Sequence, residues 1–228
     1  MTAPRVVALV AARDRADSVG ATVTALLGIG GVTEVVVVDD GSTDDTAAVA
    51  AAAGARVERL AVNRGKGGAV AAGVAASPDA DVYLLVDADV GPTAAAAAGL
   101  LLPVVSGGAD MAIAVLPTAG GRGGFGLVRR MAGAGISGAT GFRSRAPLCG
   151  QRAVRATLLR RLELAPRFGL ETALTIDALR AGARIVELDA AFDHRHTGRG
   201  FAGFAHRVRQ GRDVVAALWP RLRPWRGW

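Results

Sequence analysis

Two carboxylates separated by a single residue follow an apolar stretch near the middle of the chain. Val82–Val86 consists of β-branched, aromatic and leucine residues, and Asp87-Ala88-Asp89 comes directly after it. This composition is typical of a strand buried on both faces, and ligands of open α/β sheets bind beyond the carboxyl ends of such strands. Paired carboxylates suit Mg²⁺ or Mn²⁺, which bind through one or two carboxylates together with substrate phosphates. The tripeptide alone is equally compatible with a solvated turn.

Two further groups that could bind a nucleotide follow earlier strands. Asp39-Asp40 ends the apolar run Glu34–Val38, and the Gly-rich segment Asn63–Gly68 holds Lys66, the only lysine of the chain. A nucleoside diphosphate requires a carboxylate for its base or ribose, amides and a cation near its phosphates, and a metal at the diphosphate. Because the carboxyl ends of parallel strands meet at one edge of a sheet, we predict one nucleotide site there.

The elements that must position these groups alternate along the sequence. We expect strands at residues 5–12, 34–38, 56–62, 82–86, 110–116 and 184–188. We expect helices at residues 14–27, 69–76, 94–105, 125–137, 151–162 and 170–182, and one more that Thr43 or Asp44 caps and Gly54 ends. Strands alternating with helices predict βαβ units in an α/β domain with a mostly parallel sheet.

Composition narrows the class of protein and its partners. A chain of 228 residues suffices for one α/β domain, and its net charge of +7 favours a phosphate-bearing partner or an anionic membrane surface. No basic stripe interleaved with aromatic residues is present, so we expect no nucleic acid partner. The single cysteine, Cys149, excludes an intramolecular disulfide and favours a reducing, cytoplasmic compartment. The uncharged stretch 90–109 is Ala-rich and contains two prolines, so we expect at most peripheral membrane contact.

The order of three motifs resembles the family 2 glycosyltransferases of the GT-A fold. These motifs are Val37–Thr46, Asn63–Gly67 and Asp87–Asp89. The resemblance implies a single Rossmann-like GT-A domain with helices flanking the sheet, and a UDP-sugar donor. The first-strand motif of that family, Pro-Ala-x-Asn-Glu, corresponds here to residues 11–15, where Asp14 replaces the asparagine and the glutamate is absent. The implied donor-binding residues are Ala11, Ala12, Asp14, Asp39, Lys66, Asp87 and Ala88.

The second half of the chain is similar to one branch of that family, the glucosyl-3-phosphoglycerate synthases and related enzymes. The segments 168–177 and 193–196 carry this similarity. By resemblance, Asp89 binds the metal and takes part in catalysis, and His194 completes the metal site. Segment 148–152 resembles the acceptor-side loop of the same branch and of polyprenyl-phosphate glycosyltransferases. The expected acceptor-binding residues are Arg143, Arg145, Gly150, Gln151 and Arg195, with Arg152 as a further arginine able to receive a phosphate.

Glu171 is the expected catalytic carboxylate of the acceptor side. It follows Gly169 and would lie in the first turn of the helix 170–182, where the helix dipole favours a negative charge. A carboxylate there could hold sugar or acceptor hydroxyls or act as a general base. The alternative is that Glu171 only stabilises its helix.

These observations predict a metal-dependent glycosyltransferase that uses a nucleoside-diphosphate sugar and a small-molecule or lipid-phosphate acceptor. We expect a nucleotide-sugar-binding half at 1–117, an acceptor and metal-completing half at 118–200, and a basic amphipathic tail at 201–228 that is compatible with a homodimer. Two alternatives remain: a polyprenyl-phosphate glycosyltransferase at the membrane surface and a non-catalytic nucleotide-sugar-binding protein. A Rossmann dehydrogenase is excluded, because Gly28–Gly31 precedes the second strand rather than following the first.

Overall fold

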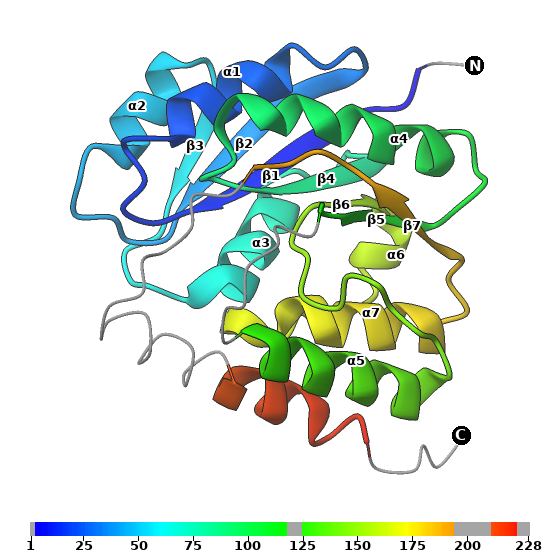
Figure 1. Cartoon of the computed structure of the whole chain (residues 1–228). Helices are drawn as coiled ribbons and strands as arrows, with labels where there is room; N and C mark the ends of the chain where they lie inside the picture. The colour runs from blue at the N-terminus through cyan, green and yellow to red at the C-terminus, as the bar shows by residue number, and fades with distance from the viewer. Residues whose placement is uncertain (1–2, 118–124, 194–210, 223–228) are drawn as a thin grey trace.

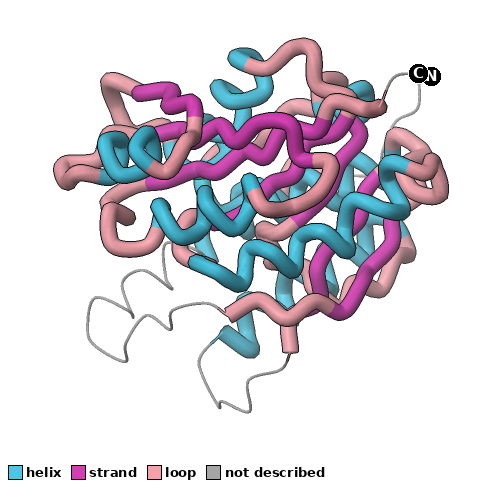
Figure 2. The backbone as a smooth tube through the Cα atoms, turned by 90° about the horizontal axis from the view of Figure 1, so that it is seen from above, coloured by secondary structure: helices cyan, strands magenta, loops and turns pink. Residues whose placement is uncertain are grey.

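The computed structural model describes residues 3–117, 125–193 and 211–222, which form a sheet covered on both faces (Figure 1). Helices α1, α2 and α4 lie on one face. Helices α3, α6 and α7 lie on the other, where α5 and the helical residues 211–218 form a further layer outside α7. In the view from above (Figure 2), the strands cross the molecule between helices. The expected α/β domain is confirmed.

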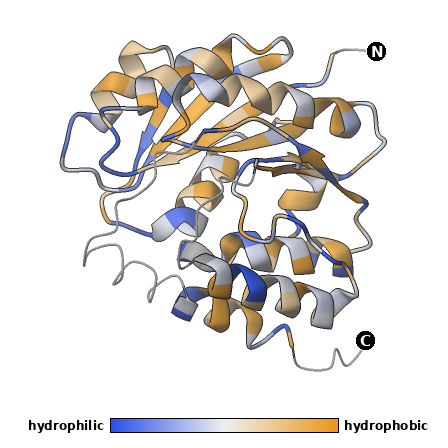
Figure 3. Ribbon diagram, viewed as in Figure 1, coloured by the Kyte–Doolittle hydropathy of each residue, from blue (hydrophilic) through white to orange (hydrophobic). Residues whose placement is uncertain are grey.

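The first half of the described chain consists of βα units. Its strands are β1 (Val6–Ala12), β2 (Val32–Asp39), β3 (Arg56–Arg59) and β4 (Val82–Asp87). Its helices are α1 (Val19–Leu27), α2 (Thr46–Ala52), α3 (Gly65–Ala76), the 3₁₀ helix η1 (Gly91–Ala97) and α4 (Ala98–Val105). Strands β1 and β4 and residues 35–39 of β2 are nearly completely buried, because they are rich in Val and Leu and have helices on both faces. Their apolar residues are orange in Figure 3.

The second half departs from that rhythm. Its strands are β5 (Met111–Val115), β6 (Arg152–Arg155) and β7 (Ile185–Asp189). Its helices are α5 (Phe125–Thr140), α6 (Ala156–Leu159), the 3₁₀ helix η2 (Arg167–Gly169) and α7 (Leu170–Arg180). Within the described residues, the sheet has seven strands in the order β3-β2-β1-β4-β6-β5-β7, and only β6 runs antiparallel to its neighbours. The expected mostly parallel sheet is therefore confirmed.

The main error of the sequence prediction concerns strand β6, because a helix was expected over residues 151–162. Residues 152–155 instead fill the slot between β4 and β5, and a single turn of helix follows them. The Ala, Arg and Leu residues of this segment favour a helix by intrinsic propensity. Pairing on both edges and complete burial of Ala153 and Val154 outweigh that preference.

Several predicted boundaries also move. The first helix begins at Val19 rather than at residue 14, because Asp14 has a φ of 50° in a loop that precedes the helix. The third strand ends at Arg59 rather than 62, and η1 precedes α4. Helix α3 begins at Gly65 rather than 69, so the Gly-rich segment forms its first turn. The carboxylate of Asp40 caps this turn, accepting hydrogen bonds from the backbone N–H groups of Arg64 and Gly65 at 2.6 and 2.8 Å.

A second, smaller core lies away from the sheet. Ile136 of α5, Ile176 of α7 and Leu218 near the C-terminus pack together in it. In the described parts of the chain no helix combines the length and apolarity needed to cross a bilayer. The predicted division into 1–117, 118–200 and 201–228 stays a prediction, since its boundaries fall in or beside segments 118–124 and 194–210, outside the described residues.

Candidate functional site

The carboxyl ends of three strands meet at one edge of the sheet. Ala12 of β1 pairs with Asp39 of β2, and Ala11 of β1 pairs with Asp87 of β4. The N–H of Asp40 donates to the carbonyl of Ala12 at 2.9 Å, which keeps the first two strands together beyond the end of β2. The predicted donor-side residues are therefore neighbours in the fold.

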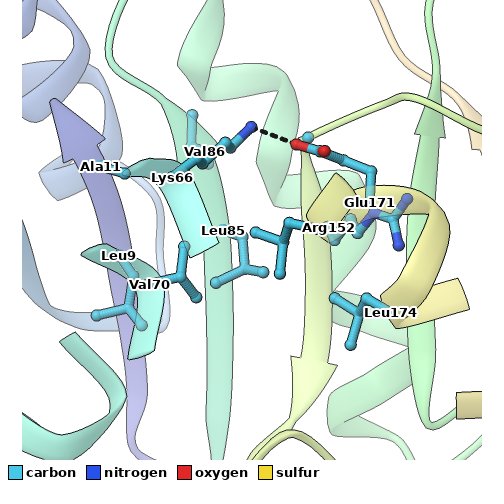
Figure 4. A pocket seen from close by; sticks show the side chains of 11 residues that line it. Leu9, Ala11, Lys66, Val70, Leu85, Val86, Arg152, Glu171 and Leu174 are labelled. Carbon is cyan, nitrogen blue, oxygen red and sulfur yellow. Dashed lines mark ion pairs between the residues drawn. The ribbon is translucent and has the colours of Figure 1, made fainter. Parts of the chain in front are cut away.

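A cluster of three charged side chains, Lys66, Asp87 and Glu171, lies at this edge. The Nζ atom of Lys66 lies 2.7 Å from Oε1 of Glu171 (Figure 4). The same atom forms a close ion pair with Asp87. The side-chain amide of Gln151 donates to the other oxygen of Asp87 at 2.8 Å. These groups come from α3, β4, α7 and the residue before β6, so the cluster joins both halves of the chain. Glu171 is 6% exposed and lies in the first turn of α7, as predicted.

The two carboxylates decide the charge state of Lys66. Burial by itself lowers the pKa of this lysine, but the negative charges of Asp87 and Glu171 outweigh burial and raise the pKa well above its ordinary value. Lys66 is therefore an ammonium ion across the working pH range. It holds the two carboxylates in place and cannot serve as a base.

Glycines at the cluster make room for this close packing. A Cβ atom at Gly150 would lie 2.3 Å from Nζ of Lys66 and within 2.9 Å of both carboxylate oxygens of Asp87. A Cβ atom at Gly67 would lie 1.9 Å from the carbonyl oxygen of Ala165. At least one glycine of the Lys66 segment is thus required for packing the first turn of α3, independently of any phosphate.

Asp39, one of the expected donor-binding residues, is buried and has partners inside the protein. Its side chain is 1% exposed, accepts a hydrogen bond from the N–H of Ser42 at 2.9 Å, and lies 3.4 Å from Nε of Arg59. Arg59 is the partner of Asp39 in the β2–β3 ladder and its side chain is 70% exposed. Arg59 is therefore an exposed cation in contact with this buried carboxylate.

Asp14 links two loops at the same edge. Its carboxylate accepts a hydrogen bond from the N–H of Thr43 at 2.9 Å, and its own N–H donates to the hydroxyl of Ser42 at 3.0 Å. The loop after β1 is thereby fixed to the loop after β2. Asp14 thus has a structural role in the altered first-strand motif.

Asp89, the predicted metal ligand, lies in the turn after β4. Its side chain is 27% exposed, and one carboxylate oxygen lies 3.8 Å from Nε of Arg15. Among the described residues no cluster of three or more His, Cys, Asp or Glu side chains is present. The carboxylates of Asp87 and Asp89 do fit a hard divalent cation that binds through one or two carboxylates together with substrate phosphates.

The remaining predicted metal ligand, His194, and the predicted acceptor residue Arg195 lie outside the described residues. The last described residue before them, Asp193, donates its N–H to the hydroxyl of Thr93 at 3.0 Å. Thr93 belongs to η1, directly after the turn that holds Asp89. The chain after β7 thus returns to the neighbourhood of the predicted metal ligand.

The predicted acceptor residues separate into two groups. Gly150 and Gln151 contact the Lys66 cluster. Arg145 lies further along the edge, where it pairs with Asp189 at the end of β7 at 2.5 Å, and Arg143 is exposed beside it. The structure therefore places two of these residues at the cluster and two near β7.

Arg152 was expected to receive a phosphate, and its position contradicts that expectation. The residue is 1% exposed. Its Nε donates to the carbonyl of Cys149 at 2.8 Å and its Nη1 to the hydroxyl of Thr175 at 3.0 Å, while its Nη2 has no hydrogen-bond partner among the described residues. Burial lowers the pKa of this guanidinium. Arg152 ties β6 to α7 beneath the cluster.

Sequence reasoning missed Arg59 and Thr22. Thr22 is a fully buried α1 residue that hydrogen-bonds the turn containing Asp89. Neither belongs to a motif. The place of Arg59 beside Asp39 follows only from the β2–β3 register.

Comparisons with known proteins place this geometry in context. Residues 8–161 match the model of the family described as Glycosyl transferase family 2. A search of curated protein sequences finds no significant match. Solved structures of glucosyl-3-phosphoglycerate synthase from Mycobacterium tuberculosis are similar over 96% of this chain and 79–80% of theirs. The complex with phosphoglyceric acid is 26% identical with a TM-score of 0.84. The complex with Mn²⁺, UDP-glucose and phosphoglyceric acid is 27% identical at 0.82, and that with Mg²⁺ and UDP is 27% identical at 0.83.

Proposed function

This chain belongs to glycosyl transferase family 2 and is a glycosyltransferase, and from that premise we propose that it transfers a sugar from a UDP-sugar to a small phosphate-bearing acceptor. The observation that carries the proposal is the cluster of Lys66, Asp87 and Glu171. It gathers a fixed cation and two carboxylates at the strand ends where ligands of such sheets bind. Similar solved structures contain UDP-glucose and phosphoglyceric acid, which supports this choice of donor and acceptor classes.

On the donor side, the proposal assigns the nucleotide to the ends of β1, β2 and β4. Asp39 would accept a hydrogen bond from the base once Arg59 moves away, and Ala11, Ala12 and Asp14 would line the same edge. Asp87, Ala88 and Lys66 would face the ribose and diphosphate. The Lys66 ammonium is already oriented by two carboxylates, so binding does not require it to become ordered.

A divalent cation, Mg²⁺ or Mn²⁺, would be held by Asp89, with His194 as the proposed further protein ligand. When bound, such an ion stabilises the departing nucleoside diphosphate as a Lewis acid. Asp89 would present its carboxylate to the diphosphate from the turn after β4, where one of its oxygens lies 3.8 Å from Nε of Arg15. Complexes of similar structures with Mn²⁺ or Mg²⁺ support this choice of ion.

On the acceptor side, Glu171 would accept a hydrogen bond from a hydroxyl of the sugar or acceptor. Its carboxylate is held by Lys66 at 2.7 Å and is shielded from bulk water. Gly150 and Gln151 border the same space, and Arg143, Arg145 and Arg195 are the proposed phosphate contacts. Arg145 would have to exchange Asp189 for that phosphate.

The first test is donor binding measured by thermal unfolding. A UDP-sugar at about one hundred times its Kd, with saturating Mn²⁺, should stabilise the fold by about 2.7 kcal/mol and raise Tm by about 5 to 10 °C. We expect UDP-sugars to outrank GDP-sugars, and Asp89→Ala to lose most of the shift. A flat response to every nucleoside-diphosphate sugar contradicts the proposal.

A transfer assay then separates the enzyme from its alternatives. Purified protein is given the stabilising donor and Mn²⁺ with phosphoglycerate, with a polyprenyl phosphate in liposomes, or with no acceptor. We expect product with the small phosphate-bearing acceptor. Product only with the lipid identifies the polyprenyl-phosphate alternative, and stabilisation without any product identifies a nucleotide-sugar-binding protein.

A further inference from the structure

The turn that holds Asp89 is fixed by a residue from a different part of the chain. Thr22 lies in the first half of α1 and is completely buried. Its hydroxyl donates to the carbonyl of Ala88 at 3.0 Å and accepts a hydrogen bond from the N–H of Gly91 at 2.9 Å. Ala88 and Gly91 are the first and fourth residues of the turn, and Asp89 lies between them. The Thr22 hydroxyl therefore bridges the two backbone groups that close the turn.

A hydroxyl is suited to this position because it donates one hydrogen bond and accepts others. The carbonyl of Ser18, one helical turn earlier, lies 3.3 Å from the same oxygen and is the longer of the two possible acceptors for its proton. Ala88 is 4% exposed and Gly91 is buried, so both backbone groups need a partner inside the protein.

Gly91 adds a second constraint on the same turn. Its φ of +53° lies in the left-handed region, where glycine is favoured. The chain then enters η1, which packs against α1. Asp89 is thus held from both ends of its turn, by the Thr22 bridge at Ala88 and Gly91 and by the start of η1.

We infer that Thr22 is a positioning residue for the metal-binding carboxylate of Asp89. The inference rests on the proposed function, since it assumes that Asp89 binds the cation. Thr22 touches neither the cation nor the substrates, and it acts by holding the backbone on both sides of Asp89. Loss of its hydroxyl releases the turn, so the carboxylate has to be ordered again each time the ion binds.

The test compares Thr22→Val, which keeps the side-chain shape but removes the hydroxyl, with Thr22→Ser, which keeps the hydroxyl. Thr24→Val is the matched control, because Thr24 lies on the same helix, is exposed, and donates to the carbonyl of Gly20 at 3.0 Å without reaching the turn. Mn²⁺ binding is measured by electron paramagnetic resonance at saturating UDP. UDP binding is measured separately by calorimetry without metal, and a melting curve is recorded for every variant.

Thr22→Val should bind Mn²⁺ about 10- to 100-fold more weakly, the usual consequence of removing a residue that orients a metal ligand. Its affinity for UDP without metal should stay unchanged. Thr22→Ser should recover most of the Mn²⁺ affinity, and Thr24→Val should behave as the wild type. Should Thr22→Val fail to fold, Thr22→Cys offers only a weak S–H donor in a small side chain and carries the same expectation.

Three results overturn the inference. If folded Thr22→Val binds Mn²⁺ as tightly as the wild type, the role of Thr22 is overturned and the proposed function is not. The same holds if Thr24→Val loses as much Mn²⁺ affinity as Thr22→Val. Absence of Mn²⁺ binding by the wild-type chain in the presence of UDP overturns the proposed function and the role of Thr22 together.

Discussion

Lys66 and Glu171 face each other from the first turns of two helices, α3 and α7, with 2.7 Å between Nζ and Oε1. The dipole of a helix favours a negative charge in its first turn and disfavours a positive one. Glu171 therefore suits its position, whereas Lys66 needs the carboxylates of Asp87 and Glu171 to be stable there. The positive charge of Lys66, the only lysine of the chain, would therefore destabilise the first turn of α3 if the two carboxylates were absent.

Replacing Lys66 with methionine should leave two like charges close together and poorly solvated. We expect Lys66→Met to lower the free energy of unfolding by about 3 kcal/mol, the low end for breaking a buried ion pair, since the Lys66 side chain is 22% exposed. The control Arg64→Met removes an exposed cation two residues earlier and should cost less than about 0.5 kcal/mol. Urea unfolding of both variants measures the difference.

The pH dependence of that difference follows from the raised pKa of Lys66. A group whose pKa is raised on folding stabilises the fold fully below its unfolded pKa of about 10.4 and loses this contribution as pH rises through the folded value. The gap between the wild type and Lys66→Met should therefore be constant from neutral to mildly alkaline pH. A gap that closes within this range contradicts the charge assignment.

Glu171→Gln tests the acceptor side. We expect kcat to fall by about 100-fold or more, the range for a lost acid–base or hydroxyl-orienting group, with little change in donor affinity. The control is Asp177→Asn on the same helix, whose carboxylate pairs with Arg221 at 2.5 to 2.9 Å. That control should lose stability and keep kcat. If steady-state kinetics give a normal kcat for Glu171→Gln, Glu171 is a structural residue and not a catalytic one.

The two carboxylates after β4 should respond differently to alanine. Asp89 lies in the turn after β4 and its side chain is 27% exposed, so Asp89→Ala should abolish transfer with little change in Tm. Asp87 accepts hydrogen bonds from Lys66 and Gln151, so Asp87→Ala should lower Tm and weaken nucleotide binding as well. Melting curves and turnover rates of Asp89→Ala and Asp87→Ala measure these two effects. Near-normal turnover in Asp89→Ala means that the metal ligand is assigned wrongly.

The sequence was sufficient for the half of the fold that consists of buried parallel strands. Apolar runs that end in Asp39 and Asp87 predict strands whose carboxyl ends meet, and the observed register aligns them through Ala12 and Ala11. The first turn of α7 at Glu171 was also predictable, because a glycine precedes it and apolar residues follow at helical spacing. Local composition carries this information.

Long-range pairing was not predictable in the same way. Strand β6 has the local preferences of a helix, and only the slot between β4 and β5 makes it a strand. The burial of Arg152 follows from that sheet order, and the contact of Arg59 with Asp39 follows from the β2–β3 register. Neither follows from any spacing in the sequence. The contact of Lys66 with Glu171 joins residues 105 positions apart, and no local pattern indicates it.

Asp110 gives a prediction in acid. Hydrogen bonds from the Arg184 side chain hold the pKa of this carboxyl far below its ordinary value, and the Arg184 N–H and Arg155 contribute too. Such a group stabilises the fold above its unfolded pKa of about 3.9 and loses that contribution as pH falls through the folded value. Asp110→Asn should cost about 1 kcal/mol at neutral pH, because solvent reaches the pair, and its deficit should shrink only below about pH 4. Urea unfolding across pH, with the exposed Glu163→Gln as control, measures this.

Gly150→Ala tests whether the cluster depends on close packing. A Cβ atom at residue 150 would lie 2.3 Å from Nζ of Lys66 and within 2.9 Å of both carboxylate oxygens of Asp87, so both side chains have to move away from residue 150. We expect Tm to fall and donor binding to weaken at least as much as in Asp87→Ala, because the same ion pair is broken without removing either charge.

The matched control for this substitution is Gly133→Ala. Gly133 lies within α5, where the only described residue that a Cβ atom would meet is Pro147, at 3.9 Å. Alanine should therefore raise stability by up to about 1 kcal/mol through its better helix propensity. Thermal unfolding with and without a UDP-sugar and Mn²⁺ gives both quantities for each variant. If Gly150→Ala keeps the full ligand-induced shift, the Lys66–Asp87 ion pair does not contribute to the donor site, and Lys66 then only supports Glu171.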